Sequence, residues 1–443
     1  MKKTNLIKPI LDKDYPMISY GSGVYLYDSS GKKYLDGSSG AVTASIGHGV
    51  PEIIQTMNEQ ANKVSFIYRS QFSSEPAETL ATKLAEITSE HFNWTFFVNS
   101  GSEATETAMK IAIQYWQEKG YQGKNKIISR WMSYHGITLG ALSMSGHSVR
   151  RARFVPLLED FPTINPPYCF RCPYHLTYPT CNTLCALELE QAIQRIGSEH
   201  IAAFIAEPII GAAGGGIVAP EGYLKKIQEI CVKNNILFIA DEVMTGIGRT
   251  GKMFGMEHWG VQADIVALGK GMSAGYTPIA ATLVSDKVIE PILSGSKLVM
   301  SGHTYSANPQ SCATSLAVIN YIENNNLVKN AEMMGNYLFS KLKLLEKKVT
   351  SIGDIRGKGL LMGIEFVSDR DNKVPFKREI SLTTKLIERA QENGLLLYPA
   401  NAGIEGVGGD AILVAPPLTI QEAEIDKLVS LLEKTLLELE HTL

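Results

Sequence analysis

The sequence has no long hydrophobic stretch and no strong excess of one charge. No apolar run approaches the roughly 20 residues that a membrane-spanning helix needs. The positive residues near the start precede no apolar segment like that of a secretory leader. Its 42 Lys and Arg against 45 Asp and Glu leave a net charge of −3, which gives no indication of binding to nucleic acid or an anionic membrane. We therefore expect a cytoplasmic protein that binds neither nucleic acid nor a membrane.

Internal repeats and low-complexity tracts are also missing, and the remaining pattern is typical of a globular α/β protein. Near-continuous apolar segments alternate with helical patterns such as 102–118 and 221–234. This alternation predicts a mostly parallel sheet covered by helices on both faces. The predicted strands are 95–98, 126–129, 201–206, 236–240, 264–268 and 279–284.

The 443 residues are enough for a large domain and a smaller one. A hairpin is expected within 24–36. Beyond about residue 325, charged helical patterns surround a strand-like segment, 359–366. A final helix is expected from Thr419, capped reciprocally by Thr419 and Glu422. We predict that segments 1–70 and 326–443 form the small domain, and that 71–325, with a cysteine-rich insert at 167–186, forms the large one.

Lys270 follows an apolar strand and stands between two glycines. An ammonium group in a dry site tends to lose its proton, and the resulting amine is a nucleophile that can attack an aldehyde. A lysine that emerges into solvent at the strand end is the simpler alternative. The neighbouring strand ends decide between the two.

In an open parallel sheet, ligands bind at the carboxyl ends of the strands. Here those ends carry a Ser-Gly-Ser turn opening a helix (Gly101, Ser102), an aromatic side chain (Tyr134) and two acids (Glu207 and Asp241). By itself, such a turn is more often a simple helix cap, but the free amides at a helix N-terminus also suit a phosphate. With Lys270, the set meets the needs of pyridoxal 5′-phosphate: a phosphate cradle, a plate for the ring, an acid for the ring nitrogen and an amine for the aldehyde.

The chain resembles the class III aminotransferases, which are pyridoxal-phosphate enzymes of fold type I. Matching motifs occur in order along nearly the whole chain, at 99–104, 134–136, 207–209, 241–251, 268–270, 303–309, 356–360 and 415–418.

The resemblance implies a role for each matched residue. Lys270 would bind the cofactor covalently and shuttle protons, and Asp241 would pair with the ring nitrogen. Val243 and Tyr134 would contact the two ring faces, Gly101 and Ser102 would bind the phosphate, and Glu207 would support the pocket. Thr304 would reach the phosphate of the neighbouring subunit, which implies a homodimer with shared active sites. For Arg249, Arg356 and Pro416-Pro417, a role in loop and domain-junction architecture is preferred.

The chain departs from the γ-aminobutyrate and ornithine type. Members of that type pair a gate glutamate with an arginine, where this sequence has Ala212 and Leu413, and they have a glutamine in place of Met244. The chain is closer to the ω-amine:pyruvate type, yet it lacks that type's flexible arginine near 406–409 and has Val42 where a bulky tryptophan aligns. These differences predict a wider pocket and favour pyruvate over 2-oxoglutarate.

Carboxylate recognition must then come from another residue. Our hypothesis is Arg69, because arginine binds carboxylates in a bidentate manner. The alternative is an arginine at the subunit interface.

Cys169, Cys172, Cys181 and Cys185 form two closely spaced pairs. Such pairs resemble zinc knuckles, in which four thiolates bind a structural zinc ion. The alternative is an ordered loop with reduced cysteines packed as small apolar residues.

The sequence therefore predicts a transaminase that moves an amino group from an amine or amino acid, including an ω-amino acid, to a keto acid. A racemase or aminomutase on the same scaffold would act without a keto acid. A non-catalytic regulator that binds pyridoxal phosphate is a further alternative, although no additional domain is evident.

Overall fold

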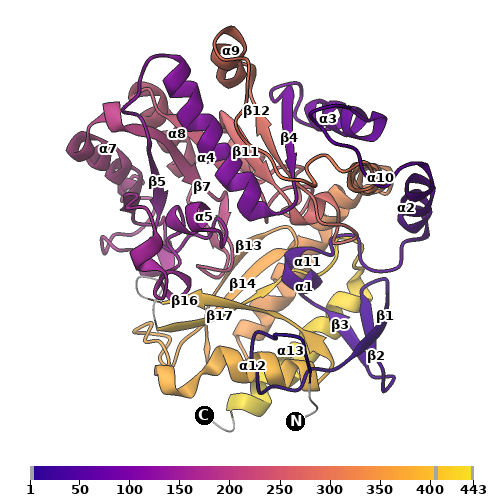
Figure 1. Ribbon diagram of the computed structural model, residues 1–443. Helices are drawn as coiled ribbons and strands as arrows, with labels where there is room; N and C mark the ends of the chain where they lie inside the picture. The colour runs from indigo at the N-terminus through magenta and orange to yellow at the C-terminus, as the bar shows by residue number, and fades with distance from the viewer. Residues whose placement is uncertain (1–3, 404–407, 441–443) are drawn as a thin grey trace.

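A seven-stranded sheet forms the centre of the larger part of the molecule (Figure 1). The computed structural model describes residues 4–403 and 408–440. The strand order is β4-β12-β11-β10-β7-β5-β6, and β12 (Ala280–Val284) is antiparallel to both of its neighbours. The other strands are β4 (Trp94–Val98), β5 (Lys126–Arg130), β6 (Thr163–Ile164), β7 (Ile201–Ala206), β10 (Leu237–Asp241) and β11 (Ile265–Leu268). The sheet is thus mostly parallel, as predicted.

Alternate residues of the central strands enter different cores, so both faces of the sheet are covered. Ala203 and Ile205 of β7 pack with residues of α4 (Gly101–Glu118), whereas Phe204 and Ala206 pack with residues of α7 (Leu184–Ile196) and α8 (Tyr223–Lys233). The apolar runs carried no period-two pattern for this reason. Each predicted strand is present, with ends that differ by at most one residue.

A second sheet, in the order β13-β14-β17-β16, lies below the first in Figure 1 and comes from the C-terminal part of the chain. Its strands are β13 (Ile352–Lys358), β14 (Leu361–Phe366), β16 (Tyr398–Ala402) and β17 (Gly409–Val414). Helices α11 (Leu327–Glu346), α12 (Leu382–Glu392) and α13 (Glu422–Glu440) accompany it. The division into domains at residues 70 and 325 stays a prediction.

The predicted N-terminal hairpin is formed by β2 (Tyr25–Asp28) and β3 (Lys33–Asp36), with β1 (Ile18–Ser22) beside β2. The edge of this small sheet is completed by β15 (Leu395–Leu396), which pairs in parallel with β3. Two helices, α2 (Pro51–Lys63) and α3 (Glu75–Ile87), follow this hairpin along the chain.

The cap predicted for the last helix is wrong. Helix α13 starts at Glu422 rather than Thr419, and the Thr419 hydroxyl is buried without a partner among the described residues. The carboxylate of Glu424 instead accepts from the Gln421 amide at 3.0 Å. A carboxylate two positions further along satisfies a free amide at this helix start.

No helix in the described part of the chain is both long enough and apolar enough to cross a membrane.

Candidate active site

The carboxyl ends of β4, β5, β7, β10 and β11 meet at one edge of the central sheet, because these strands all run in the same direction. A cavity of about 190 Å³ lies at this edge. Its lining includes Gly101, Ser102, Tyr134, His135, Gly136, Glu207, Ile209, Ala212, Asp241, Val243, Met244, Thr245 and Lys270. Seven residues predicted for cofactor binding therefore come together: Gly101, Ser102, Tyr134, Glu207, Asp241, Val243 and Lys270.

Lys270 is partly buried in this cavity, two residues beyond β11. Desolvation lowers its pKa to about 8, against the opposing effects of Asp241 and Glu207. Its backbone has a φ of 43°, a conformation that is strained for a side chain other than glycine and that clusters at functional sites. The lowered pKa and the buried surroundings favour a neutral, nucleophilic amine over a lysine that emerges into solvent.

Asp241 ends β10 and is only 4% exposed. Its Oδ1 accepts from the Val243 amide at 3.0 Å, and its Oδ2 lies 2.7 Å from Nδ1 of His135. The other ring nitrogen of His135 is buried and has no partner among the described residues. The two hydrogen bonds orient the carboxylate, which can then hold a proton on a ring nitrogen inside the cavity.

Glu207 follows β7 and is buried. One carboxylate oxygen accepts from the Tyr134 amide and the other from the Gly211 amide, both at 3.0 Å. Burial raises the pKa of Glu207, while these amides favour the charged form. Glu207 thus fixes the loop that carries Tyr134 and the turn that leads to Ala212.

The first turn of α4 supplies the place for a phosphate. The amide of Ile137 donates to Ser102 Oγ at 3.0 Å, which leaves the Ser102 hydroxyl hydrogen free to donate. A Cβ atom on Gly101 would lie 2.8 Å from the Val243 side chain, and one on Gly136 would lie 2.5 Å from Ser102 Oγ. The backbone therefore approaches the cavity where only glycine fits, at a helix N-terminus that favours anions.

These residues fit pyridoxal 5′-phosphate. The group would be held by Lys270 at its aldehyde, by Asp241 at its ring nitrogen, by Gly101 and Ser102 at its phosphate, and by Val243 and Tyr134 against its ring. When bound, it supplies an electron sink for carbanions at the substrate carbon.

The fold and this site define a pyridoxal-phosphate transaminase of fold type I. The class-III aminotransferase family model matches residues 12–436, so the chain belongs to that family.

Known proteins of similar sequence and structure agree with this assignment. The chain is 52% identical over 438 residues to the uncharacterized aminotransferase YodT of Bacillus subtilis, covering 99% of this chain and 98% of that protein. It resembles an (S)-enantioselective omega-transaminase from Thermomicrobium roseum, with 37% identity, a TM-score of 0.91 and coverage of 98% and 96%. A PLP-bound amine transaminase from an uncultivated Pseudomonas species gives 32% identity, a TM-score of 0.93 and coverage of 98% and 99%.

Thr304, Arg69 and Val42 lie outside the lining of the Lys270 cavity. Thr304 is exposed. The Arg69 guanidinium donates to the carbonyl of Ser301 at 2.5 Å and lies 4.9 Å from the ring centre of Phe96. Val42 is buried in the main core at the end of a short kinked helix, α1 (Ser39–Val42). The roles predicted for these residues stay predictions.

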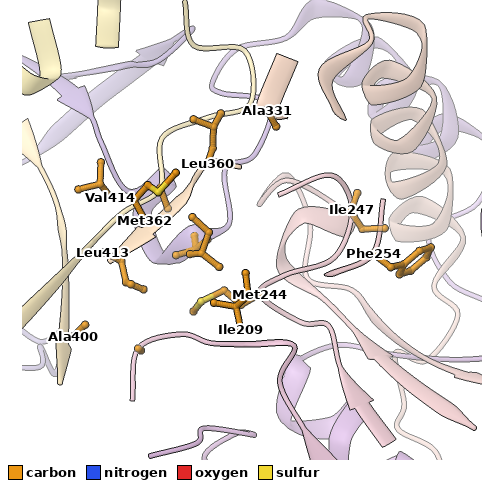
Figure 2. Packing of buried hydrophobic residues seen from close by; sticks show 14 of the residues in the cluster. Ile209, Met244, Ile247, Phe254, Ala331, Leu360, Met362, Ala400, Leu413 and Val414 are labelled. Atoms are coloured by element: carbon orange, nitrogen blue, oxygen red, sulfur yellow. The ribbon is translucent and has the colours of Figure 1, made fainter. Parts of the chain in front are cut away.

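The positions of the gate glutamate and the arginine are apolar in the structure as well as in the sequence. Ala212 lines the cavity, and Leu413 is fully buried in the same apolar cluster as Met244 and Ile209 (Figure 2). No charge is available from these positions for the second carboxylate of 2-oxoglutarate. Of the positions 406–409, where the sequence has no arginine, 406 and 407 lie outside the described residues, and 408 and 409 are glycines.

Two other arginines have the architectural role that we expected. Arg249 donates to the carbonyls of Leu360 and Pro416, at 3.0 and 2.5 Å. Arg356 donates to the carbonyls of Gly214 and Gly215 and lies 2.8 Å from Glu365. Both connect the loops around the central sheet to the C-terminal sheet.

The zinc site predicted from the cysteine spacing is not supported. Cys169, Cys172, Cys181 and Cys185 are free thiols that line one small cavity of about 20 Å³ with Tyr174, Leu176 and other side chains. In the described ranges, no group of three or more His, Cys, Asp or Glu residues could hold a metal ion. Burial raises the pKa of Cys169, and that of Cys185 to about 12, which disfavours the thiolates that zinc requires.

His135 is the site residue that sequence reasoning missed. It stands next to Tyr134 in the predicted motif, but its role depends on an approach to Asp241 across 106 positions of the chain. No local pattern indicates such a contact.

Proposed function

We propose that the protein transfers an amino group from an amine or amino acid, including ω-amino acids, to a keto acid, with pyruvate preferred to 2-oxoglutarate. The proposal rests on one observation: Lys270 lies in the same cavity as the buried Asp241–His135 pair. The apolar positions Ala212 and Leu413 support the preference for pyruvate, because they offer no partner for a second carboxylate.

The side chains around the cavity have separate tasks in such a reaction. The Lys270 amine, with its lowered pKa, can take a proton from the substrate carbon that bears the amino group. It can then donate that proton to the carbon that was the aldehyde carbon of the cofactor. Asp241, oriented by His135, keeps a ring nitrogen protonated. The half-buried Tyr134 closes the side of the cavity and limits access of water.

We infer a homodimer with shared active sites. Thr304 lies on an exposed loop near large exposed apolar side chains, and the rings of Phe66 and Tyr305 are in contact at 6.1 Å. Large exposed apolar side chains of this kind are typical of a protein–protein interface. On segments 66–72 and 300–305 they are Phe66, Tyr68, Phe72, Met300 and Tyr305. We also propose a cytoplasmic location.

A donor–acceptor panel tests the proposed function. Holoenzyme is mixed with amines and amino acids in combination with pyruvate, 2-oxoglutarate or oxaloacetate, and both carbonyl and amino products are measured. We expect product only when a donor and a keto acid are both present. Turnover of a single amino acid without any acceptor would instead identify a racemase or aminomutase, and a complete lack of turnover would favour a regulator. Lys270→Ala should abolish both cofactor attachment and turnover.

A further inference from the structure

The guanidinium group of Arg150 lies beside the active-site cavity without lining it. Arg150 belongs to the short helix α6 (Ser148–Arg151) and is exposed. Its Cζ lies 4.7 Å from the ring centre of Tyr134, over the ring. Tyr134 itself lines the Lys270 cavity. The arginine is therefore separated from the cavity by one aromatic side chain.

Arg150 differs from the other arginines near the site because, among the described residues, its guanidinium pairs with the Tyr134 side chain rather than with a backbone carbonyl. Arg249, Arg356 and Arg69 all donate to backbone carbonyls. For Arg150, the described residues provide neither a carboxylate within ion-pair distance nor a carbonyl acceptor. The hydrogen bond to the Tyr134 hydroxyl occupies one of the five N–H groups of the guanidinium. The remaining N–H groups can bind a carboxylate, which arginine does with two hydrogen bonds.

The groups around Arg150 leave its charge uncompensated. The ring of His147 meets that of Tyr134 edge-on at 6.0 Å, and the amide nitrogen of Asn401 lies 3.2 Å from Nε2 of His147. Burial, and then the charge of Arg150, lower the pKa of His147 to about 4, so the imidazole is neutral. Arg150 also contributes to the lowered pKa of Lys270, after burial, which places the two groups within electrostatic reach.

We propose that Arg150 binds the distal carboxylate of an ω-amino acid donor. This inference rests on the proposed transamination and adds the substrate group that the enzyme recognises. A carboxylate adjacent to the reacting carbon would lie inside the cavity, where Arg150 is not part of the lining. A carboxylate several bonds away from the amino group would pass Tyr134 and accept from the remaining N–H groups of Arg150.

Matched donors test the assignment on the holoenzyme with pyruvate as acceptor. 6-Aminohexanoate and hexylamine have chains of the same length and differ in the terminal carboxylate. We expect Arg150→Ala to lower kcat/KM for 6-aminohexanoate by about 10- to 100-fold, the usual range for one lost hydrogen-bonded charge. The kcat/KM for hexylamine and the KM for pyruvate should change less than about twofold. Arg150→Lys should restore part of the kcat/KM for 6-aminohexanoate. Arg153→Ala is the matched control, since Arg153 is exposed three residues away.

A binding measurement provides a readout that does not depend on turnover. Hexanoate should bind to the wild-type holoenzyme in calorimetry, and Arg150→Ala should weaken that binding while Arg153→Ala does not. Three results with Arg150→Ala would overturn the inference: equal losses of kcat/KM with both donors, a change confined to the KM for pyruvate, or a loss seen with 2-oxoglutarate but not with 6-aminohexanoate. A wild-type enzyme that does not accept 6-aminohexanoate as a donor would overturn it as well. If the wild type turned over neither donor, the proposed function would fail instead.

Discussion

His135 and Asp241 form a buried pair in which Nδ1 of the imidazole lies 2.7 Å from Oδ2 of the carboxylate. The histidine follows β5 and the aspartate ends β10, so the pair joins two strand ends across β7. A carboxylate held in this way keeps its orientation toward the cavity without help from solvent.

The first prediction concerns this pair. His135→Ala should lower kcat by roughly 10- to 100-fold, because a hydrogen bond to a charged group contributes about 1.5–3 kcal/mol. Asp241→Asn should have a larger effect, since it removes the charge that holds the proton on the ring nitrogen. Steady-state kinetics measure both. His175→Ala, which changes an exposed histidine far along the chain from the motif, should retain normal activity. Normal turnover by Asp241→Asn would contradict the assigned role.

The second prediction concerns pH. The pKa of Lys270 is lowered to about 8 by burial, so the amine is charged below that pH and neutral above it. Only the neutral amine attacks an aldehyde. The rate at which apoenzyme binds pyridoxal phosphate covalently should therefore rise with pH, with a midpoint near 8 rather than near 10.5, the ordinary pKa of lysine. Stopped-flow absorbance measures this rate.

The same titration has a directional control. Asp241→Asn removes a charge that raises the pKa of Lys270, so its midpoint should move to lower pH. A midpoint near 10 in the wild type would show that the lysine is exposed to solvent.

The third prediction concerns the close approach of Gly101 to Val243. A Cβ atom at position 101 would lie 2.8 Å from Cγ1 of Val243. Overpacking of this kind costs about 1–3 kcal/mol, so Gly101→Ala should weaken cofactor binding by about 5- to 100-fold in equilibrium dialysis. The double variant Gly101→Ala/Val243→Ala should recover part of the affinity, because the second change removes the clashing methyl groups. If the double variant bound no better than Gly101→Ala, the contact would not be the cause.

The fourth prediction separates Arg69 from Arg150. The Arg69 guanidinium donates to Ser301, three residues before Thr304. Loss of the Arg69–Ser301 hydrogen bond should destabilise the loop that carries Thr304, whichever substrate is bound. Arg69→Ala should therefore lower kcat/KM for 6-aminohexanoate and hexylamine by similar factors and weaken cofactor binding. A loss confined to 6-aminohexanoate would instead support the carboxylate role predicted from the sequence.

The sequence predicted the strand ends well because each buried strand is a short, nearly pure apolar run, and the first polar residue marks its end. Asp241 and Lys270 were found in this way. The Arg150–Tyr134 contact had no such signal, since the chain between the two residues consists of irregular segments and short helices such as α5 (Leu139–Ser143), with no constant period. The cysteine pairs show the opposite case: their spacing matched a metal motif, but burial raises the pKa of Cys169 and Cys185 and so favours their protonated thiols. The spacing of residues indicates which side chains can lie close together, and burial shifts the pKa values that set their protonation states.

The pairing of β3 with β15 also bears on how the protein is made. Leu35 lies opposite Leu395, so β3 is synthesised about 360 residues before the strand with which it pairs. Contacts between such distant segments form late in folding, and a strand edge is prone to aggregation as long as it is unpaired. The hairpin of β2 and β3 must therefore remain without this neighbour while the residues between β3 and β15 are synthesised.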